Sequence, residues 1–141
     1  MKTLHLTLTR NWFDAILCGE KNEEYRELKP YWIKRLIEIN SPEEMPGENK
    51  VIPENIIFDM QSRLPEEFDS VLKGYYSKPK QYDVIEFSNG YGPNVPKMIV
   101  EYKGLSFGVG LYVFGAPNYP VFILQLGKIL KVKNYELKKL A

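Results

Sequence analysis

Apolar and polar residues alternate at the start of the chain. Leu4, Leu6 and Leu8 fall on one side of an extended segment. His5 and Thr7 fall on the other side. A period of two is typical of a strand with one buried face, so the first element is predicted to be a half-buried β-strand.

The spacing then becomes helical. Apolar residues recur four positions apart between residues 12 and 18, which predicts a helix there. Asn11 is expected to cap its first turn, and Gly19 is expected to supply the left-handed residue that ends it. A second strand is predicted directly afterwards, over residues 21–27.

A second helix is predicted to begin at Pro30, because proline suits the first helical position. Its apolar stripe is formed by Ile33, Leu36 and Ile37. Prolines are too frequent for a continuous element between about residues 40 and 81, so this segment is interpreted as an insertion. Within it a short helix is predicted from Pro65 to Gly74, with three residues expected to pack onto the rest of the domain: Phe68, Val71 and Leu72.

The rest of the chain is rich in Val, Ile, Phe and Tyr and predicts short strands. Turns are expected at Asn89-Gly90, Lys103-Gly104 and Gly127-Lys128. The pattern favours a barrel or sandwich, built as one domain over residues 1–141. The predicted strands are 82–87, 98–102, 105–113, 121–126 and 129–132.

Composition and charge narrow the function classes. The chain has 19 Lys and Arg against 18 Asp and Glu, so any contact with nucleic acid must be local. One cysteine and one histidine cannot form a disulfide or a Cys/His zinc site, and no metal or cofactor is expected. The first residues lack the apolar run of a signal peptide and nothing is long enough to cross a membrane, so a cytoplasmic protein with no membrane partner is expected.

The segment 19–26 is unusually dense in charge for the start of a strand. Glu24 and Arg26 have the same parity in a strand and can present an acceptor and a forked donor to one ligand. A twist at Gly19 would bring Lys21 to join them. Lysine and arginine suit a phosphate or a base carbonyl, and glutamate suits an exocyclic amine.

This segment resembles the GxKxxExR signature of the ASCH family, whose four fixed positions are Gly19, Lys21, Glu24 and Arg26 here. The resemblance extends over most of the chain except the insertion. It implies an α+β protein with a PUA-like β-barrel, flanking helices and a partly helical insertion. It also implies a cleft where the signature residues gather and bind RNA or a modified nucleoside or nucleotide.

Two other functions remain open. Some small ASCH proteins are amidohydrolases of N4-acetylcytidine, and this resemblance implies catalytic roles for Lys21 and Glu24. In those enzymes a threonine stands where this chain has Glu24, and a carboxylate beside Lys21 favours its charged form, so binding is the preferred hypothesis. A third hypothesis is a protein-interaction adaptor that uses the insertion, with a buried Glu24–Arg26 pair of structural value and Lys21 merely solvated.

Four further residues are candidates for the ligand site. Tyr25 and Tyr91 are expected to stack on a base, and Asn89 to read a base edge, unless Asn89 only forms a turn. Arg10 is expected either to add positive charge to the cleft or to solvate the end of a strand.

Other residues that attract attention are interpreted as structural. Tyr31 and Trp32 are expected in the core rather than beside a base. Cys18 is expected to be a small packing residue, because no general base is identifiable near it.

Overall fold

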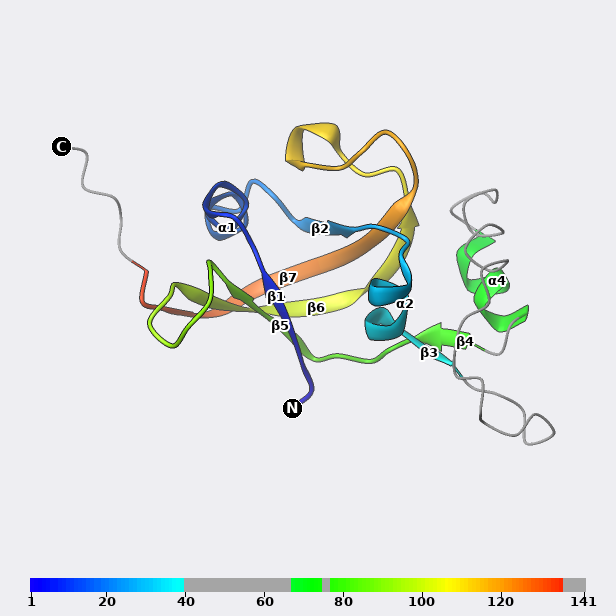
Figure 1. The fold of residues 1–141 in the computed structure, drawn as a ribbon, viewed down its shortest axis with the longest axis horizontal. Helices are drawn as coiled ribbons and strands as arrows, with labels where there is room; N and C mark the ends of the chain where they lie inside the picture. The colour runs from blue at the N-terminus through cyan, green and yellow to red at the C-terminus, as the bar shows by residue number, and fades with distance from the viewer. Residues whose placement is uncertain (40–66, 75–76, 136–141) are drawn as a thin grey trace. The chain divides into compact units, whose positions relative to one another are not determined.

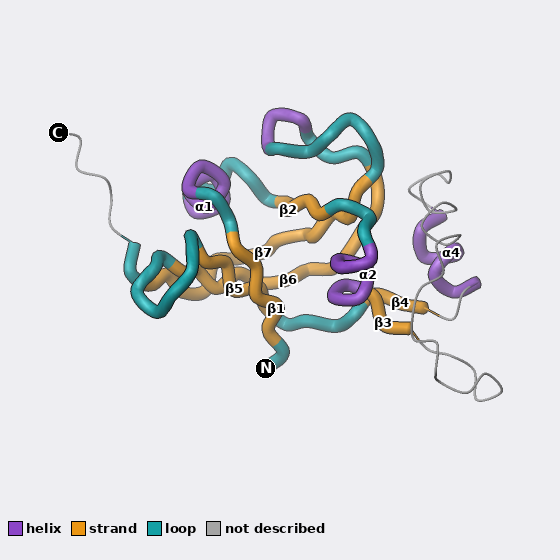
Figure 2. Tube along the Cα trace, viewed as in Figure 1, coloured by secondary structure: helices purple, strands orange, loops and turns teal. Residues whose placement is uncertain are grey.

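The computed structural model describes residues 1–39, 67–74 and 77–135 (Figure 1). Within these ranges the fold is α+β, as expected, with a five-stranded mixed half-barrel sheet and three short helices. The strand order in the sheet is β1-β5-β6-β7-β2, and β3 pairs with β4 separately (Figure 2). None of the described helices is long and apolar enough to cross a membrane.

The elements have the following bounds. The strands are β1 Thr3–Thr7, β2 Glu23–Arg26, β3 Ile37–Ile39, β4 Ser77–Pro79, β5 Val84–Ser88, β6 Lys97–Gly108 and β7 Val121–Lys133. The helices are α1 Arg10–Leu17, α2 Pro30–Leu36 and α4 Phe68–Gly74, with a 3₁₀ turn at Tyr112–Phe114.

The chain forms two compact units. Unit 1 comprises residues 1–24, 81–104 and 125–141, and unit 2 comprises residues 25–80 and 105–124. Strands β2, β6 and β7 contribute residues to both units.

Unit 1 is built around the parallel pair β1–β5 and the antiparallel pair β5–β6. In the first pair Leu4 lies opposite Ile85, and in the second Phe87 lies opposite Met98. The alternation seen in the sequence is confirmed, because Leu4 and Leu6 are buried while their neighbours in β1 are not. The core of this unit also contains Phe13, Ile16 and Val100.

Helix α1 begins two residues earlier than predicted, at Arg10. Thr9 occupies the N-cap position, and Asn11 lies in the first turn, so the prediction that Asn11 caps the helix is wrong. The Thr9 hydroxyl instead donates to the Asn11 Oδ1 at 2.6 Å. The predicted stop is confirmed, since Gly19 has a φ of 85°.

Two predicted turns lie inside long strands. Strand β6 continues through Lys103 and Gly104, and β7 continues through Gly127. Gly104 remains in β6 with a φ of 136°. A Cβ at Gly127 would lie 3.0 Å from the Cβ of Glu101, so this glycine permits a close approach rather than a reversal of the chain.

Unit 2 contains α2, which starts at Pro30 as predicted. Ile37 was expected on the helical stripe but is the first residue of β3. It pairs with Pro79 of β4 in antiparallel register, and its β-branched side chain favours the extended conformation.

The helix predicted in the insertion is present as α4. Phe68 is buried and stacks on Phe107 with ring centroids 5.6 Å apart. It also meets Phe122 edge-on at 6.4 Å, and Leu72 is buried. Pro65 and residues 40–66 as a whole lie outside the described residues, as does the side chain of Val71. The strand expected over 105–113 ends at Gly108.

Candidate functional site

Lys21 and Glu24 of unit 1 form a buried ion pair. The Lys21 Nζ lies 3.0 Å from the Glu24 Oε1. Lys21 is 2% exposed and Glu24 is 4% exposed. In a regular strand, two residues three positions apart would point to opposite sides. Here Lys21 and Glu24 meet because the backbone turns after Gly19.

The backbone around the pair is anchored on both sides. The Lys21 amide donates to the Ala15 carbonyl of α1 at 3.0 Å. The Leu126 amide of β7 donates to the Asn22 carbonyl at 3.1 Å. The Gln125 side chain also donates to the Glu23 carboxylate at 3.0 Å. Lys21 is thus presented from a fixed turn between α1 and β2.

Trp12 is a site residue that the sequence analysis did not identify. Its indole ring lies beneath the Lys21 ammonium, with 4.5 Å between Nζ and the ring centroid. An indole is the strongest cation–π partner among the side chains, so it partly replaces the water that Lys21 has lost. Trp12 lies on α1, nine positions before Lys21, and no periodic sequence signal connects the two.

This geometry corrects one element of the adaptor hypothesis. Lys21 was expected to be solvated under that hypothesis, but it is buried against Glu24 and Trp12. The physical reason is that the turn after Gly19 directs the chain back under α1.

Arg26 of unit 2 has a similar aromatic neighbour. Its guanidinium lies 4.7 Å from the centroid of the Trp32 ring, and Arg35 lies 5.3 Å from the same ring. Trp32 is only half-buried and Tyr31 is 63% exposed, so the expectation that both belong to the core is wrong. The buried face of α2 is formed by Ile33 and Leu36, which leaves Tyr31 and Trp32 away from it.

Tyr25 is held by its own unit. Its hydroxyl accepts a hydrogen bond from the Leu111 amide at 3.2 Å. Its ring lies against Gly110, where a Cβ would clash with it. One surface of the ring is therefore in contact with the β6–β7 connection.

Arg10 lies in the first turn of α1 and pairs with Asp14. Its Nε donates to both carboxylate oxygens, at 3.0 and 3.1 Å. Its guanidinium lies 4.7 Å from the Tyr135 ring, and the hydrogen bond to Asp14 raises the pKa of Arg10. Its charge is thus already balanced by a neighbouring carboxylate.

Asn89 and Tyr91 lie in the loop that joins β5 to β6. The Asn89 amide group donates to the Leu8 carbonyl at 3.1 Å, which ties this loop to the end of β1. Tyr91 is 88% exposed between Gly90 and Gly92, both of which have positive φ. The loop therefore combines the expected turn with a fully presented aromatic ring.

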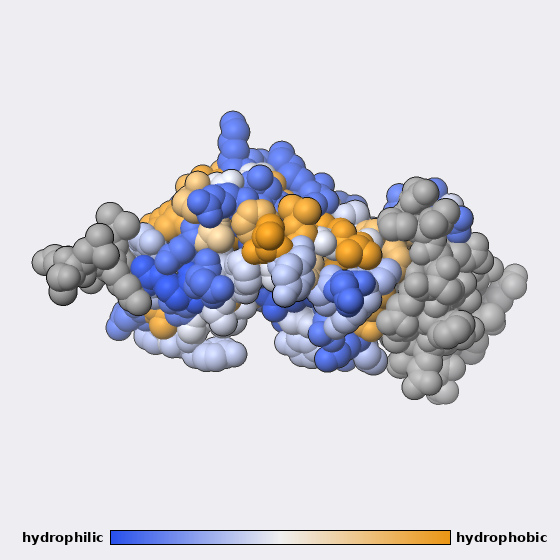
Figure 3. All heavy atoms as spheres, turned by 90° about the horizontal axis from the view of Figure 1, so that it is seen from above, coloured by the Kyte–Doolittle hydropathy of each residue, from blue (hydrophilic) through white to orange (hydrophobic). Residues whose placement is uncertain are grey.

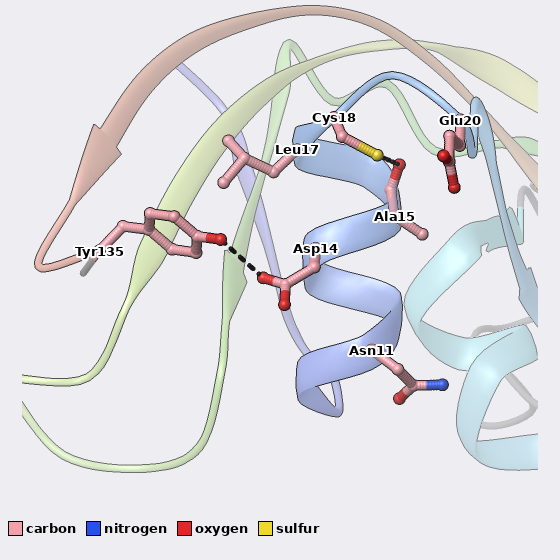
Figure 4. Close-up of a pocket in the computed structure, with 7 residues that line it drawn as sticks. All are labelled: Asn11, Asp14, Ala15, Leu17, Cys18, Glu20 and Tyr135. Carbon is pink, nitrogen blue, oxygen red and sulfur yellow. Dashed lines mark hydrogen bonds between the residues drawn. The ribbon is translucent and has the colours of Figure 1, made fainter. Parts of the chain in front are cut away.

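A shallow hollow of about 460 Å³ lies on the outer side of α1 (Figure 4). Cys18, expected to be a packing residue, is exposed there, and its thiol donates to the Ala15 carbonyl at 3.4 Å. The Tyr135 hydroxyl donates to Asp14 at 3.0 Å across one end. Lys21 and Glu24 do not line it. Its lining residues are Asn11, Asp14, Ala15, Leu17, Cys18, Glu20 and Tyr135.

The described residues offer ammonium, guanidinium and carboxylate groups beside aromatic rings. In the ranges 1–39, 67–74 and 77–135, no group of three or more His, Cys, Asp or Glu residues is arranged to hold a metal ion. No protein-family model, curated protein or solved structure matches this chain.

Proposed function

We propose that this protein is a PUA-like domain of the ASCH type that binds RNA or a modified nucleoside or nucleotide. The observation that carries the proposal is the ion pair of Lys21 and Glu24, buried beside Trp12. The GxKxxExR residues and the half-barrel sheet support the assignment to this fold type.

The energetic argument starts from desolvation. Removing both an ammonium and a carboxylate from water costs several kcal/mol per ion, and their attraction repays this only with favourable geometry. Apolar residues of the same size usually stabilise a fold as well or better. A buried pair is therefore weak support for a purely structural role, and its presence is more easily explained by a ligand.

The chemistry of the pair suits a nucleobase. A lysine ammonium donates to base carbonyls, and a carboxylate accepts from exocyclic amines. Trp12 adds an aromatic surface of the kind on which single bases stack. A bound base would replace part of the Lys21–Trp12 contact. Its ring would stack on the Trp12 indole, and its polar edge would meet Lys21 and Glu24. Arg26 beside Trp32, and exposed Tyr91, are further groups able to stack on or contact a base.

Amide hydrolysis of an acylated nucleoside is the second candidate. The specific observation in its favour is that Lys21 and Glu24, both almost fully excluded from water, lie 3.0 Å apart, so that an amine and a carboxyl group share one buried site. Lys21 would then be the base or nucleophile, with Glu24 beside it. The binding proposal requires only that the ligand contacts these residues. The hydrolysis proposal also requires that the ligand is converted to product.

The two tryptophans of the chain allow a direct test, because Trp12 lies beside Lys21 and Trp32 beside Arg26. The variants Trp12→Phe and Trp32→Phe each leave one tryptophan as the fluorescent reporter. Cytidine, N4-acetylcytidine, nucleotides and short RNAs are titrated into each protein. We expect a saturable change in the fluorescence of Trp12, and mass spectrometry of acetylcytidine reactions detects any loss of the acetyl group.

Two variants are compared with the wild type. Lys21→Met/Glu24→Met changes the buried pair, and Lys29→Met is the control at the surface. The double variant removes both charges while keeping side-chain length, and we expect at least tenfold weaker binding. Lys29→Met is expected to bind as the wild type does. If no member of the panel changes the fluorescence or the melting temperature of the wild type, the binding proposal is wrong and the adaptor hypothesis gains.

A further inference from the structure

The connection between β6 and β7 exposes an unusual number of large apolar side chains. Within unit 2, Tyr112 is 83% exposed and Val113 is 72% exposed. Val109, Leu111 and Tyr119 are 59%, 55% and 46% exposed. Figure 3 views the chain from the side of this connection and shows apolar residues gathered at the surface. We refer to residues 109–119 as the apolar loop.

The apolar loop has a defined structure. The Phe114 amide donates to the Leu111 carbonyl at 3.0 Å, and the Gly115 amide donates to the Tyr112 carbonyl at 3.1 Å. Gly115 adopts a φ of 94°, which closes the 3₁₀ turn. The Tyr25 hydroxyl accepts from the Leu111 amide at 3.2 Å. The backbone is therefore fixed while the five large apolar side chains named above remain exposed.

The loop also carries no charge. In a chain with 26% charged residues, none of the residues from 109 to 120 is Lys, Arg, Asp, Glu or His. Surface loops are normally polar, and an exposed apolar patch on a soluble domain usually marks an interaction site. Without a cation, the loop lacks the electrostatic contribution that governs binding to a nucleic-acid backbone.

The charged residue that contacts the loop is itself paired with an opposite charge. Tyr119 donates to the Glu27 carboxylate at 3.3 Å, and Glu27 pairs with Lys29 at 2.8 Å. Glu27 and Lys29 therefore do not give the edge of the loop a net positive charge, which would attract it to anionic lipid. The chemistry instead fits an uncharged apolar protein surface.

We propose that the apolar loop is a self-association surface, and that its occupant is the apolar loop of a second copy of this chain. An uncharged patch is complementary to itself, because bringing two copies together around a two-fold axis opposes no like charges.

The size of the patch indicates a weak dimer. One tyrosine alone can bury about 150–250 Å². At their exposures the five side chains offer on the order of 500 Å² per protomer, so a two-fold contact buries about 1,000 Å². This is at the lower limit for a specific interface and predicts a reversible, concentration-dependent dimer rather than a permanent one.

Sedimentation equilibrium of the full chain over a range of concentrations tests the proposal. We expect the weight-average mass to rise from the monomer value of 16.5 kDa toward twice that value. The substitution Tyr112→Asp places a charge in the most exposed part of the apolar loop, where it would be buried in the contact, and is expected to weaken the dimer at least tenfold. Tyr112→Phe is expected to retain it.

Tyr91→Asp is the matched control, because Tyr91 is equally exposed but lies in unit 1. It is expected to leave the association unchanged, with circular dichroism showing that every variant is folded. A wild type that remains monomeric at the highest concentration overturns the proposal, and so does a dimer that Tyr112→Asp does not weaken. Flotation of the monomeric protein with neutral lipid vesicles would assign the loop to a membrane surface instead.

Discussion

Replacing Lys21 with methionine tests the buried ion pair most directly. The substitution keeps the length of the side chain but removes the ammonium that lies 3.0 Å from the Glu24 carboxylate. Glu24 is 4% exposed, so water cannot readily take the place of that ammonium. Removing one partner of a buried pair typically costs about 3–5 kcal/mol.

This loss of free energy corresponds to a large change in melting temperature. An unfolding entropy of about 2.1 cal/mol/K per residue gives about 0.3 kcal/mol/K for a chain of 141 residues. Lys21→Met should therefore lower the melting temperature by roughly 10–17 °C. Differential scanning calorimetry and urea unfolding measure the loss independently.

Lys29→Met provides the control for this experiment. Lys29 lies 2.8 Å from Glu27, closer than the atoms of the buried pair, but its side chain is 66% exposed. Exposed pairs contribute little because water screens them, so this variant should melt close to the wild type. If Lys21→Met destabilises the protein no more than Lys29→Met does, burial of the pair is not what makes it important, and the reasoning is wrong.

Three other substitutions test separate features of the structure. Gly110→Ala should destabilise the protein by about 1–3 kcal/mol in urea unfolding, because its Cβ would overlap the Tyr25 ring; an unchanged midpoint would contradict this packing. Asn89→Ala should cost about 1 kcal/mol in the same assay, because it removes the hydrogen bond that ties its loop to β1. The Lys128 amide donates to Glu101 and lowers the pKa of that carboxyl below its usual 4.5, so its stabilisation is present above that pH and is lost on acidification. The melting temperatures of Glu101→Gln and wild type should therefore differ at neutral pH and converge as the pH falls through the pKa of Glu101, and a gap that stays constant during acidification would refute this.

Features governed by neighbouring residues were predictable from the sequence. The alternation that buries Leu4 and Leu6 depends only on strand geometry, and Gly19 ends α1 because glycine readily adopts positive φ. Pro30 begins α2 for an equally local reason.

The glycines inside β6 and β7 show where local reasoning fails. Gly104 and Gly127 carry the same sequence signal as a turn, but both lie within long strands. At Gly127 the need for glycine comes from Glu101 and Lys103, which approach it from elsewhere in the chain. A single sequence contains no information on that contact, so the strands were divided at the wrong positions.

The candidate site was predicted in part for the same reason. The charged segment drew attention to Lys21 and Glu24, but parity in a strand suggested Glu24 and Arg26 as the pair that faces one way. The contact between Lys21 and Trp12 depends on the return of the chain beneath α1, which is a tertiary feature.

The variant Lys21→Met/Glu24→Met separates structural from functional explanations of the pair. Replacing both charges by apolar groups of similar size removes the two partners of this ion pair together, so stability should return to within about 1–2 kcal/mol of the wild type or exceed it. If the ion pair serves only the fold, this variant should retain every activity of the protein. If it serves a ligand, the variant should be stable and yet fail to bind. Stability together with lost binding is the one combination that a structural role cannot produce.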